Sequence, residues 1–177
     1  MLGSRRNIFL VGLMAVGKTT VGRCLAAELG MRFLDTDQVI EERAGADISW
    51  IFDVEGELGF RDREEHVVED LTQLSGIVLA TGGGVVLRPE NRRNLASRGI
   101  VIYLDTSIDR LVQRTRHDKR RPLLRGGNRE ALERLARERA PLYEDVADYR
   151  FNADRRSAKA LAREISAVLQ KDEIVNG

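Results

Sequence analysis

A glycine-rich octapeptide near the N-terminus constrains the fold of this chain more than any other feature. Residues 12–19 read Gly-Leu-Met-Ala-Val-Gly-Lys-Thr, which matches the phosphate-loop pattern G-x-x-x-x-G-K-[ST]. The pattern requires a strand before it and a helix after it. Both are predicted, from the apolar run Ile8 to Val11 and from helical spacing between about Lys18 and Leu29. We therefore expect an α/β fold that binds phosphate. A chance glycine turn before a helix is the alternative.

Short apolar runs alternate with amphipathic stretches along the chain, which favours βαβ units and a parallel sheet buried on both faces. The length of 177 residues suits one domain, expected at 1–177. Later strands are predicted at residues 32–34, 77–81, 101–104 and 149–153. Later helices are predicted at residues 38–44, 48–54, 61–74, 89–97, 108–115, 129–139 and 157–169, with a long polar loop at 117–128.

Two of these helices carry specific expectations. The helix at 61–74 should bury one side, formed by Val67, Val68, Leu71 and Leu74. The helix that begins at residue 129 should end before Pro141, because proline removes a backbone hydrogen bond from a helix interior. Arg61 would then open one helix and Arg139 would close another.

Composition excludes several classes of protein. A formal net charge of +1 creates no overall field toward nucleic acid or membrane. No stretch approaches the roughly 20 apolar residues of a membrane span. The apolar run after the basic N-terminus stops at the glycine loop, which favours a buried strand over a signal peptide. The single cysteine, Cys24, permits no internal disulfide and is expected in the core. We expect a cytoplasmic monomer without nucleic-acid or membrane partners.

The phosphate loop has a definite chemistry. Its glycines let successive amides point at phosphate oxygens, and the helix N-terminus adds a positive dipole end. Lys18 can reach the β- and γ-phosphates, and the Thr19 hydroxyl can ligate Mg²⁺. Position 15 is alanine where many such loops carry glycine, so its methyl group is expected to tighten the loop. The expected nucleotide contacts here are Ala15, Val16, Gly17, Lys18, Thr19 and Thr20.

Two aspartates follow the second predicted strand. Asp35 and Asp37 should point to the same side, because side chains alternate along a strand. Ligands of open α/β sheets bind beyond the carboxyl ends of the strands. One carboxylate could hold waters of a Mg²⁺ ion, and the other could orient an acceptor hydroxyl and take its proton late in transfer. Alternatively, Asp37 only caps the next helix.

Three glycines and two arginines complete the candidate acceptor site. Gly82, Gly83 and Gly84 follow the third predicted strand and can expose bare backbone amides to a ligand. A plain flexible turn is the alternative. The guanidinium groups of Arg61 and Arg139 could form forks that match a carboxylate. Most arginines in so arginine-rich a chain are merely solvated, so neither stands out alone.

The long polar loop contains the basic run Lys119-Arg120-Arg121-Pro122-Leu123-Leu124. A mobile lid with an arginine could close over the triphosphate, exclude water and neutralise charge on the transferred group. A solvated basic loop is the simpler alternative.

These segments together resemble the shikimate kinase family. They occur in the family's order and approximate spacing, and the likeness covers about residues 5–170. Each segment apart from the phosphate loop is a weak signal, but five in order are hard to obtain by chance. The further segments are Asp35-Thr36-Asp37, residues 59–65 (Gly-Phe-Arg-Asp-Arg-Glu-Glu), the triple glycine, residues 121–124 (Arg-Pro-Leu-Leu) and residues 139–143 (Arg-Ala-Pro-Leu-Tyr).

The resemblance implies a three-layer P-loop kinase with five parallel strands in the order 2-3-1-4-5, a substrate-binding segment at about 37–62 and a lid at about 117–128. It implies that ATP and shikimate give ADP and shikimate 3-phosphate, a step toward chorismate and the aromatic amino acids. On the acceptor side, Asp37 would hold shikimate hydroxyls and orient the 3-hydroxyl. Arg61 and Arg139 would grip the carboxylate, and the triple glycine would lie against the substrate.

On the nucleotide side, the resemblance implies one Mg²⁺ per subunit, supported by Asp35 through its water ligands. Arg121 would be the lid arginine near the β- and γ-phosphates and would join Lys18 and Asp37 as a catalytic residue. Arg114 and Arg156 would line the adenine, with the register at Arg156 open to a slip of one residue.

Two other functions stay open from the residues alone. One is another small-molecule P-loop kinase, for gluconate or a nucleoside. A nucleoside acceptor would favour a stacking pair of aromatic residues, which these motifs do not supply. The other is a nucleotide-dependent switch, but a GTPase switch should carry Asn-Lys-x-Asp for guanine, and the sequence has none.

Overall fold

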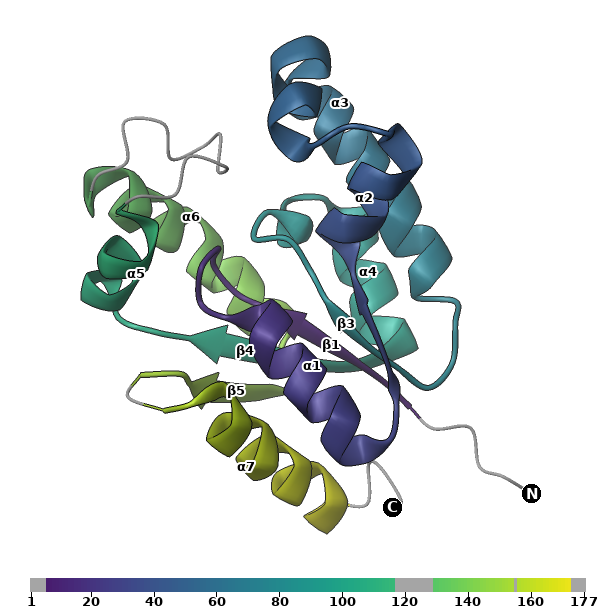
Figure 1. Cartoon of the computed structure of the whole chain (residues 1–177), viewed down its shortest axis with the longest axis vertical. Coiled ribbons are helices and arrows are strands. Elements are labelled where there is room, and N and C mark those ends of the chain that lie inside the picture. Colours follow the sequence, from purple (N-terminus) through teal and green to yellow (C-terminus); the bar gives the residue numbers. More distant parts are fainter. Residues whose placement is uncertain (1–5, 117–128, 155, 173–177) are drawn as a thin grey trace.

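The computed structural model, which describes residues 6–116, 129–154 and 156–172, contains a five-stranded sheet whose strand pairs are all parallel (Figure 1). The strands lie in the order β2-β3-β1-β4-β5, which confirms the predicted α/β class and strand order. Their bounds are β1 Asn7–Val11, β2 Arg32–Asp35, β3 Ile77–Ala80, β4 Gly99–Asp105 and β5 Tyr149–Asn152.

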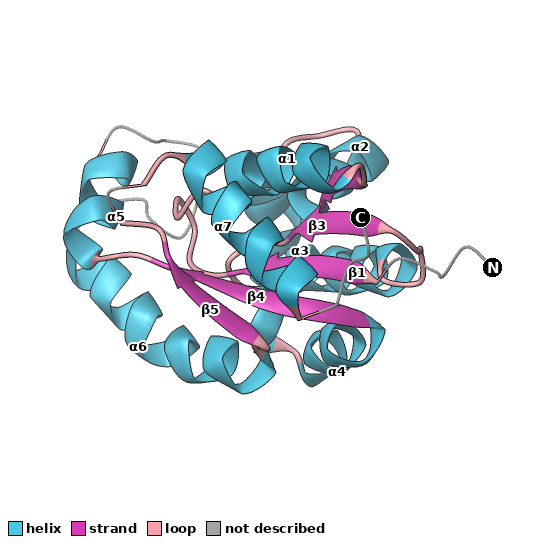
Figure 2. Cartoon of the chain, turned by 90° about the horizontal axis from the view of Figure 1, so that it is seen from below, coloured by secondary structure: helices cyan, strands magenta, loops and turns pink. Residues whose placement is uncertain are grey.

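Helices cover both faces of this sheet, with α1 and α7 on one face and α4 and α6 on the other (Figure 2). Such a three-layer arrangement buries a parallel sheet on both sides. The helices are α1 Lys18–Leu29, α2 Thr36–Ala44, α3 Ile48–Leu71, α4 Pro89–Arg98, α5 Ile108–Thr115, α6 Arg129–Val146 and α7 Ala158–Lys171, with a 3-10 turn η1 at Val85–Leu87.

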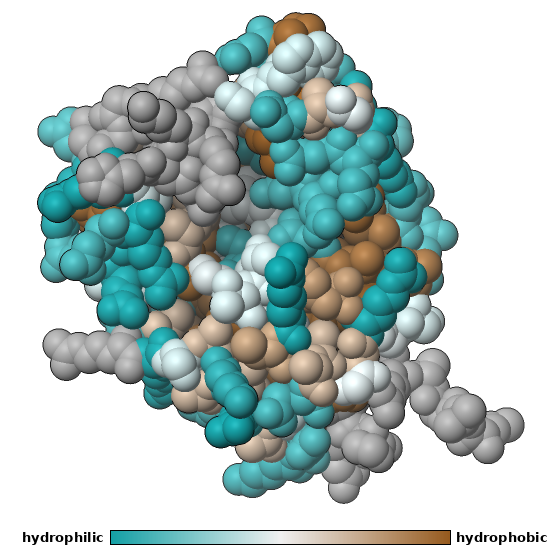
Figure 3. All heavy atoms as spheres, in the orientation of Figure 1, coloured by the Kyte–Doolittle hydropathy of each residue, from teal (hydrophilic) through white to brown (hydrophobic). Residues whose placement is uncertain are grey.

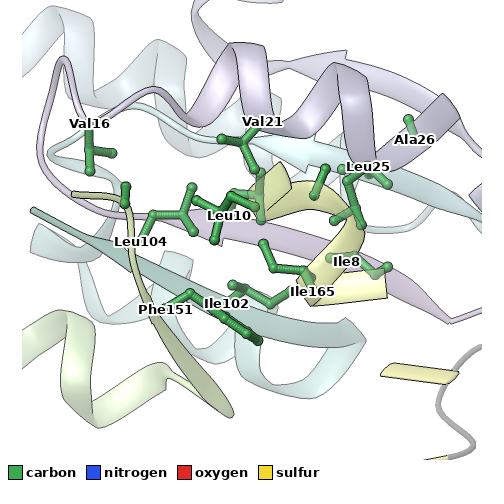
Figure 4. Close-up of a cluster of buried hydrophobic side chains, with 14 of the residues drawn as sticks. Ile8, Leu10, Val16, Val21, Leu25, Ala26, Ile102, Leu104, Phe151 and Ile165 are labelled. Carbon is green, nitrogen blue, oxygen red and sulfur yellow. The ribbon is translucent and has the colours of Figure 1, made fainter. Parts of the chain in front are cut away.

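The central strand β1 divides the core into two clusters, because alternate side chains point to opposite faces. Ile8 and Leu10 join the cluster under α1 and α7, which includes Leu25 and Ile165 (Figure 4). Phe9 and Val11 point to the other face and join the second cluster, which lies under α3, α4 and α6. The whole of β1 is buried, which explains why its residues from Ile8 to Val11 form a continuous apolar run after the polar Asn7. In contrast, the face seen in Figure 3 carries mostly hydrophilic side chains with smaller hydrophobic areas between them.

Helix α3 joins two segments that were predicted as separate helices, with a kink at Gly56 (φ 74°, ψ 178°). The helix ends at Leu71, and Leu74 is 39% exposed, so the prediction that Leu74 faces the core is wrong. The buried side chain of Asn7 donates to the carbonyl oxygens of Thr72 and Leu74 at 3.5 and 2.6 Å. These bonds hold the main chain in a turn after the helix, so Leu74 does not continue the helical spacing of the buried face.

Helix α6 runs through Pro141, so the prediction that it ends before this proline is wrong. Tyr143 and Val146, which lie beyond the proline, are buried in the second core cluster. Their burial offsets the backbone hydrogen bond that a proline removes from a helix. In consequence Arg139 lies inside a helix instead of at its end. Arg61 likewise lies within α3 instead of opening a helix.

The predicted lid at 117–128 lies outside the described residues, and the assignment of 1–177 to one domain stays a prediction. In the parts of the chain that are described, no helix combines the length and the apolar character that crossing a membrane requires.

Candidate active site

The phosphate loop connects β1 to α1 and depends on unusual backbone conformations. Gly12 and Gly17 have φ values of 147° and 103°, which glycine adopts without cost. A side chain on Gly12 would also overlap the carbonyl oxygen of Leu104 on β4. Ala15 has a φ of 64°, which is rare for a residue with a β-carbon. An alanine at this position therefore holds a strained backbone conformation, while the expected tightening of the loop by its methyl group stays a prediction.

Arg114, predicted to lie near the nucleotide, contacts the outside of this loop. Its Nη1 atom donates to the carbonyl oxygens of Ala15 and Val16, both at 3.0 Å. These bonds fix α5 against the loop although about a hundred residues separate the partners. The Val16 side chain is buried in the core, so this residue can face a nucleotide only through its main chain.

Lys18 and Thr19 connect the loop to its surroundings. The Lys18 ammonium donates to the carbonyl oxygens of Gly12 and Leu13 at 2.5 and 2.8 Å, which keeps the lysine folded along the loop. The Thr19 hydroxyl donates to Oδ2 of Asp35 at 2.6 Å. The start of α1 therefore meets the end of β2, and these two oxygen-bearing side chains form a pair.

Asp35 and Asp37 have different surroundings. Asp35 is the N-cap of α2, and its Oδ1 accepts from the backbone amides of Asp37 and Gln38 at 2.9 and 3.4 Å. The helix cap is therefore Asp35, and the alternative interpretation of Asp37 as the cap is wrong. Oδ1 of Asp37 is buried and has no hydrogen-bond partner among the described residues. Burial above all, and then the charges of Asp35 and Glu64, raise the pKa of Asp37 to about 7.

Glu64 is a site residue that sequence reasoning missed. It is fully buried, and its Oε1 accepts from Nη1 of Arg61 at 2.9 Å. Oε2 has no hydrogen-bond partner in the described part of the chain, and burial raises the pKa of this carboxyl group against the charge of Arg61. In the sequence, Glu64 is one of several charged residues in the stretch 59–65 and was given no role of its own. However, Glu64 shares helical spacing with Val67, Val68 and Leu71, and that spacing could have indicated burial.

Arg61 and Arg139 are 6% and 3% exposed, which contradicts the interpretation of both as solvated arginines. Charged side chains are almost never so deeply buried without a partner. Arg61 pairs with Glu64 and lies over the Phe60 ring, 5.0 Å from its centroid. Nε of Arg61 and Nη1 of Arg139 are buried donors without a hydrogen-bond acceptor among the described residues. Both guanidinium groups therefore keep donors that an anionic ligand could satisfy.

Each of the three glycines makes room for a different neighbour. A β-carbon on Gly82 would lie 2.9 Å from Oδ1 of Asp37, and one on Gly83 would lie 3.1 Å from the Met14 amide nitrogen. On Gly84 it would overlap the guanidinium group of Arg61. The Gly82 amide already donates to the Thr36 hydroxyl at 3.0 Å. The glycines therefore admit site side chains and the phosphate loop, a role beyond the bare amides expected from the sequence.

These residues line one pocket of about 550 Å³, called the acceptor pocket below. This volume is in the ordinary range for a small-molecule site. Phe52 and Phe60, with ring centroids 4.8 Å apart, supply an apolar wall that sequence reasoning also missed. No spacing in the sequence distinguishes them from core residues. The polar residues that line the pocket include Thr19, Asp35, Asp37, Arg61, Glu64 and Arg139, with Gly82, Gly83 and Gly84 beside them. The pocket is also lined by Arg23, Gln38, Glu41, Asp47 and Ser49.

Not every predicted residue is brought to this region. Arg121 lies outside the described residues. Arg156 forms an ion pair with Glu164 on α7, so its contact with adenine stays a prediction. Thr20 is exposed on the first turn of α1.

The sheet order, together with a phosphate loop beside the acceptor pocket, is typical of a P-loop kinase. The family model for shikimate kinase matches residues 14–170. The shikimate kinase of Vibrio parahaemolyticus is 60% identical over 171 residues, which are 96% of this chain and 99% of that protein. The chain therefore belongs to the shikimate kinase family.

Solved structures agree with this assignment. The shikimate kinase from Acinetobacter baumannii in complex with shikimate aligns with a TM-score of 0.93 at 47% identity, over 95% of this chain and 94% of that one. A gluconokinase from Sinorhizobium meliloti aligns with a TM-score of 0.54 at 16% identity, over 94% and 93% of the two chains. This second likeness shows a shared fold alone.

Proposed function

We propose that this chain transfers the γ-phosphate of ATP to the 3-hydroxyl of shikimate, giving ADP and shikimate 3-phosphate on the route to chorismate and the aromatic amino acids. The observation that carries the proposal is the acceptor pocket beside the phosphate loop, where the buried Arg61 and Arg139 meet the buried Oδ1 atom of Asp37. A pocket with two guanidinium groups and a carboxylate suits a small molecule with one carboxylate and several hydroxyls.

The two arginines would bind the shikimate carboxylate. Nε of Arg61 and Nη1 of Arg139 are buried donors whose hydrogen bonds are unmet within the described residues. A buried donor without an acceptor is costly, so a carboxylate that satisfies both would be held firmly. Phe52 and Phe60 would contact the apolar part of the ring, and the triple glycine would allow the ring to approach the main chain.

Asp37 would orient the attacking hydroxyl and accept its proton. The hydroxyl oxygen forms a bond to the γ-phosphorus, the bond from that phosphorus to the bridging oxygen of ADP breaks, and the proton passes to the Asp37 carboxylate. A pKa near 7 suits this step, because a general base works best close to the operating pH. Lys18 acts electrostatically on Asp37 and belongs to the phosphate loop, so it would link the two substrates.

Lys18 and the loop amides would stabilise the charge on the transferred group, with Arg121 proposed to add a second cation from the lid. Arg114 and Arg156 are proposed at the adenine. For Arg114 the support is its contact with the loop carbonyls of Ala15 and Val16.

Thr19 and Asp35 fit one Mg²⁺ ion. Their oxygens lie 2.6 Å apart at the edge of the acceptor pocket, and hydroxyl and carboxylate oxygens are ligands that this ion takes. Within the described ranges, no three His, Cys, Asp or Glu side chains form a metal cluster of their own. Mg²⁺ keeps several waters and needs few protein ligands, so Thr19 would bind directly and Asp35 through water. When bound, the ion would neutralise the β- and γ-phosphates.

A coupled assay of ADP release tests the function. Purified protein with MgATP should turn over rapidly with shikimate and only slowly without it. Gluconate and nucleoside monophosphates serve as comparison acceptors, because other P-loop kinases use them. Equal turnover with gluconate, or a rate that no acceptor changes, would refute the proposal. A monomer in the cytoplasm stays our expectation.

A further inference from the structure

Three buried hydroxyl groups surround the triple glycine that forms one wall of the acceptor pocket. The Thr81 hydroxyl donates to the Leu10 carbonyl oxygen at 2.7 Å and fastens the segment to β1. The Thr36 hydroxyl accepts from the Gly82 amide at 3.0 Å. The Tyr143 hydroxyl donates to the Gly83 carbonyl oxygen. Thr36 and Tyr143 are both fully buried.

These last two hydroxyls come from elements that carry acceptor residues. Thr36 precedes Asp37 at the start of α2, and Tyr143 lies one turn after Arg139 on α6. Each hydrogen bond therefore joins the glycine segment to the helix that presents a candidate acceptor ligand. Neither hydrogen bond was expected from the sequence, where Tyr143 was part of a motif but was given no role.

The Tyr143 side chain has little freedom to move. Its ring stacks on Tyr103 with centroids 5.2 Å apart and an interplanar angle of 29°. Burial raises the pKa of its hydroxyl, so the group stays a neutral donor at working pH. A fixed donor of this kind determines where the Gly83 carbonyl oxygen lies.

The position of Gly83 matters because this residue is tightly enclosed. A β-carbon placed on it would lie 3.1 Å from the Met14 amide nitrogen of the phosphate loop and 3.3 Å from Nη1 of Arg139. Met14, Gly83 and Arg139 also line the acceptor pocket. A small rotation of this peptide would therefore press on the phosphate loop or on the guanidinium group and change the shape of the pocket.

We propose that Thr36 and Tyr143 are positioning residues, whose hydroxyls set the Gly82–Gly83 main chain relative to Asp37 and Arg139 and thereby fix the geometry of the acceptor site. The inference rests on the proposed function, since it concerns binding of the same acceptor. A Phe ring at position 143 would fill the core equally well, so packing alone gives no reason for the hydroxyl.

Steady-state kinetics with shikimate and MgATP test this inference on Tyr143→Phe, which removes one oxygen atom. We expect the KM for shikimate to rise about five- to tenfold, the worth of one buried hydrogen bond, with the KM for ATP unchanged. Tyr149→Phe is the matched control. The Tyr149 hydroxyl donates to Asp172 at 2.6 Å on the surface, so both constants should stay at wild-type values.

A second pair of variants tests the hydrogen bond between Thr36 and Gly82. Thr36→Val keeps the shape of the side chain and leaves the Gly82 amide without its acceptor, while Thr36→Ser restores a hydroxyl. The KM for shikimate should rise in the first and return toward the wild-type value in the second. This pair decides the matter if Tyr143→Phe does not fold.

Unchanged kinetics in Tyr143→Phe or Thr36→Val, whether or not Tm falls, would overturn the inference. So would an equal rise in the KM for both substrates, because that pattern indicates general loosening of the fold. A wild-type protein without shikimate-dependent turnover would instead refute the proposed function itself. An active wild type with unaltered variants refutes only the positioning role.

Discussion

Compared with the phosphate loop, the acceptor pocket draws its residues from far more of the chain. The loop is one continuous octapeptide at residues 12–19, and its candidate ligands are mostly main-chain amides. The pocket combines side chains from α2, α3 and α6 with the main chain after β3. The first region is specified locally, and the second exists only once the sheet and its helices have packed.

The two regions also differ in how they hold charge. Lys18 is folded along the loop on carbonyl oxygens, at 2.5 and 2.8 Å. The pocket instead has four charged side chains, Asp37, Glu64, Arg61 and Arg139, each with a buried polar atom that lacks a partner among the described residues. Unmet buried groups are costly to the fold. The difference teaches that specificity for the acceptor is obtained at the expense of stability, whereas the nucleotide would be bound mainly by main-chain amides, whose conformation the loop glycines permit.

The largest expected effect is on the nucleotide side. Lys18→Ala removes the charge aimed at the transferring phosphate, so kcat should fall by about 10³ or more. Lys159→Ala, on the exposed side of α7, is the control and should keep wild-type activity. Wild-type turnover in Lys18→Ala, measured by ADP release, would show that the loop does not act as assigned.

Asp37→Asn should separate activity from stability. Without a base, kcat should fall by about 10²–10³. The folded pKa of about 7 lies above the ordinary 3.8, so the native state binds this proton more tightly than the unfolded state. Stability is therefore lost as pH rises from about 4 to 7, and the full cost remains above 7. Removing the charge should raise the free energy of unfolding at pH 8 by up to about 4 kcal/mol.

Two measurements check that prediction. Chemical denaturation at pH 8 and pH 4 should show a gain in stability only at the higher pH, and a less stable variant at pH 8 would contradict it. In the wild type, kcat/KM should fall as pH drops through about 7, because the base becomes protonated.

Arg139→Ala should have a smaller effect that is confined to the acceptor. The KM for shikimate is expected to rise about 10- to 100-fold, because charged hydrogen bonds to the carboxylate are lost, while kcat changes less. Arg137→Ala, exposed on the same helix, is the control. An unchanged KM in Arg139→Ala would remove this residue from the pocket and break the contrast between the two regions.

The sequence predicted the local region well and the assembled region only in part. The phosphate loop and the parallel α/β class follow from a motif and from apolar runs, which are local signals, whereas the strand order was implied only by the resemblance to shikimate kinases. Arg61 and Arg139 could be named only through resemblance, because nothing in an arginine's neighbours reveals that folding will bury it. Tyr143 was missed because its partner, Gly83, is distant in the sequence. Glu64 was missed because it and its partner Arg61 lie among other charged residues. Pro141 led to a wrong prediction of the end of α6, because the burial of Tyr143 and Val146 outweighed the low helix propensity of proline.

The smallest expected effect tests how much strain the alanine at position 15 adds to the phosphate loop. Ala15 has a φ of 64°, which costs an L-residue about 1 kcal/mol. Ala15→Gly removes that cost but adds freedom to the unfolded chain, so the unfolding free energy should rise by less than about 1 kcal/mol. Ala27→Gly, at an exposed helical position of α1, should lower it by about 1 kcal/mol. Opposite signs in thermal unfolding of the two variants would locate the strain at Ala15, and a loss in both would show that the loop accommodates its methyl group.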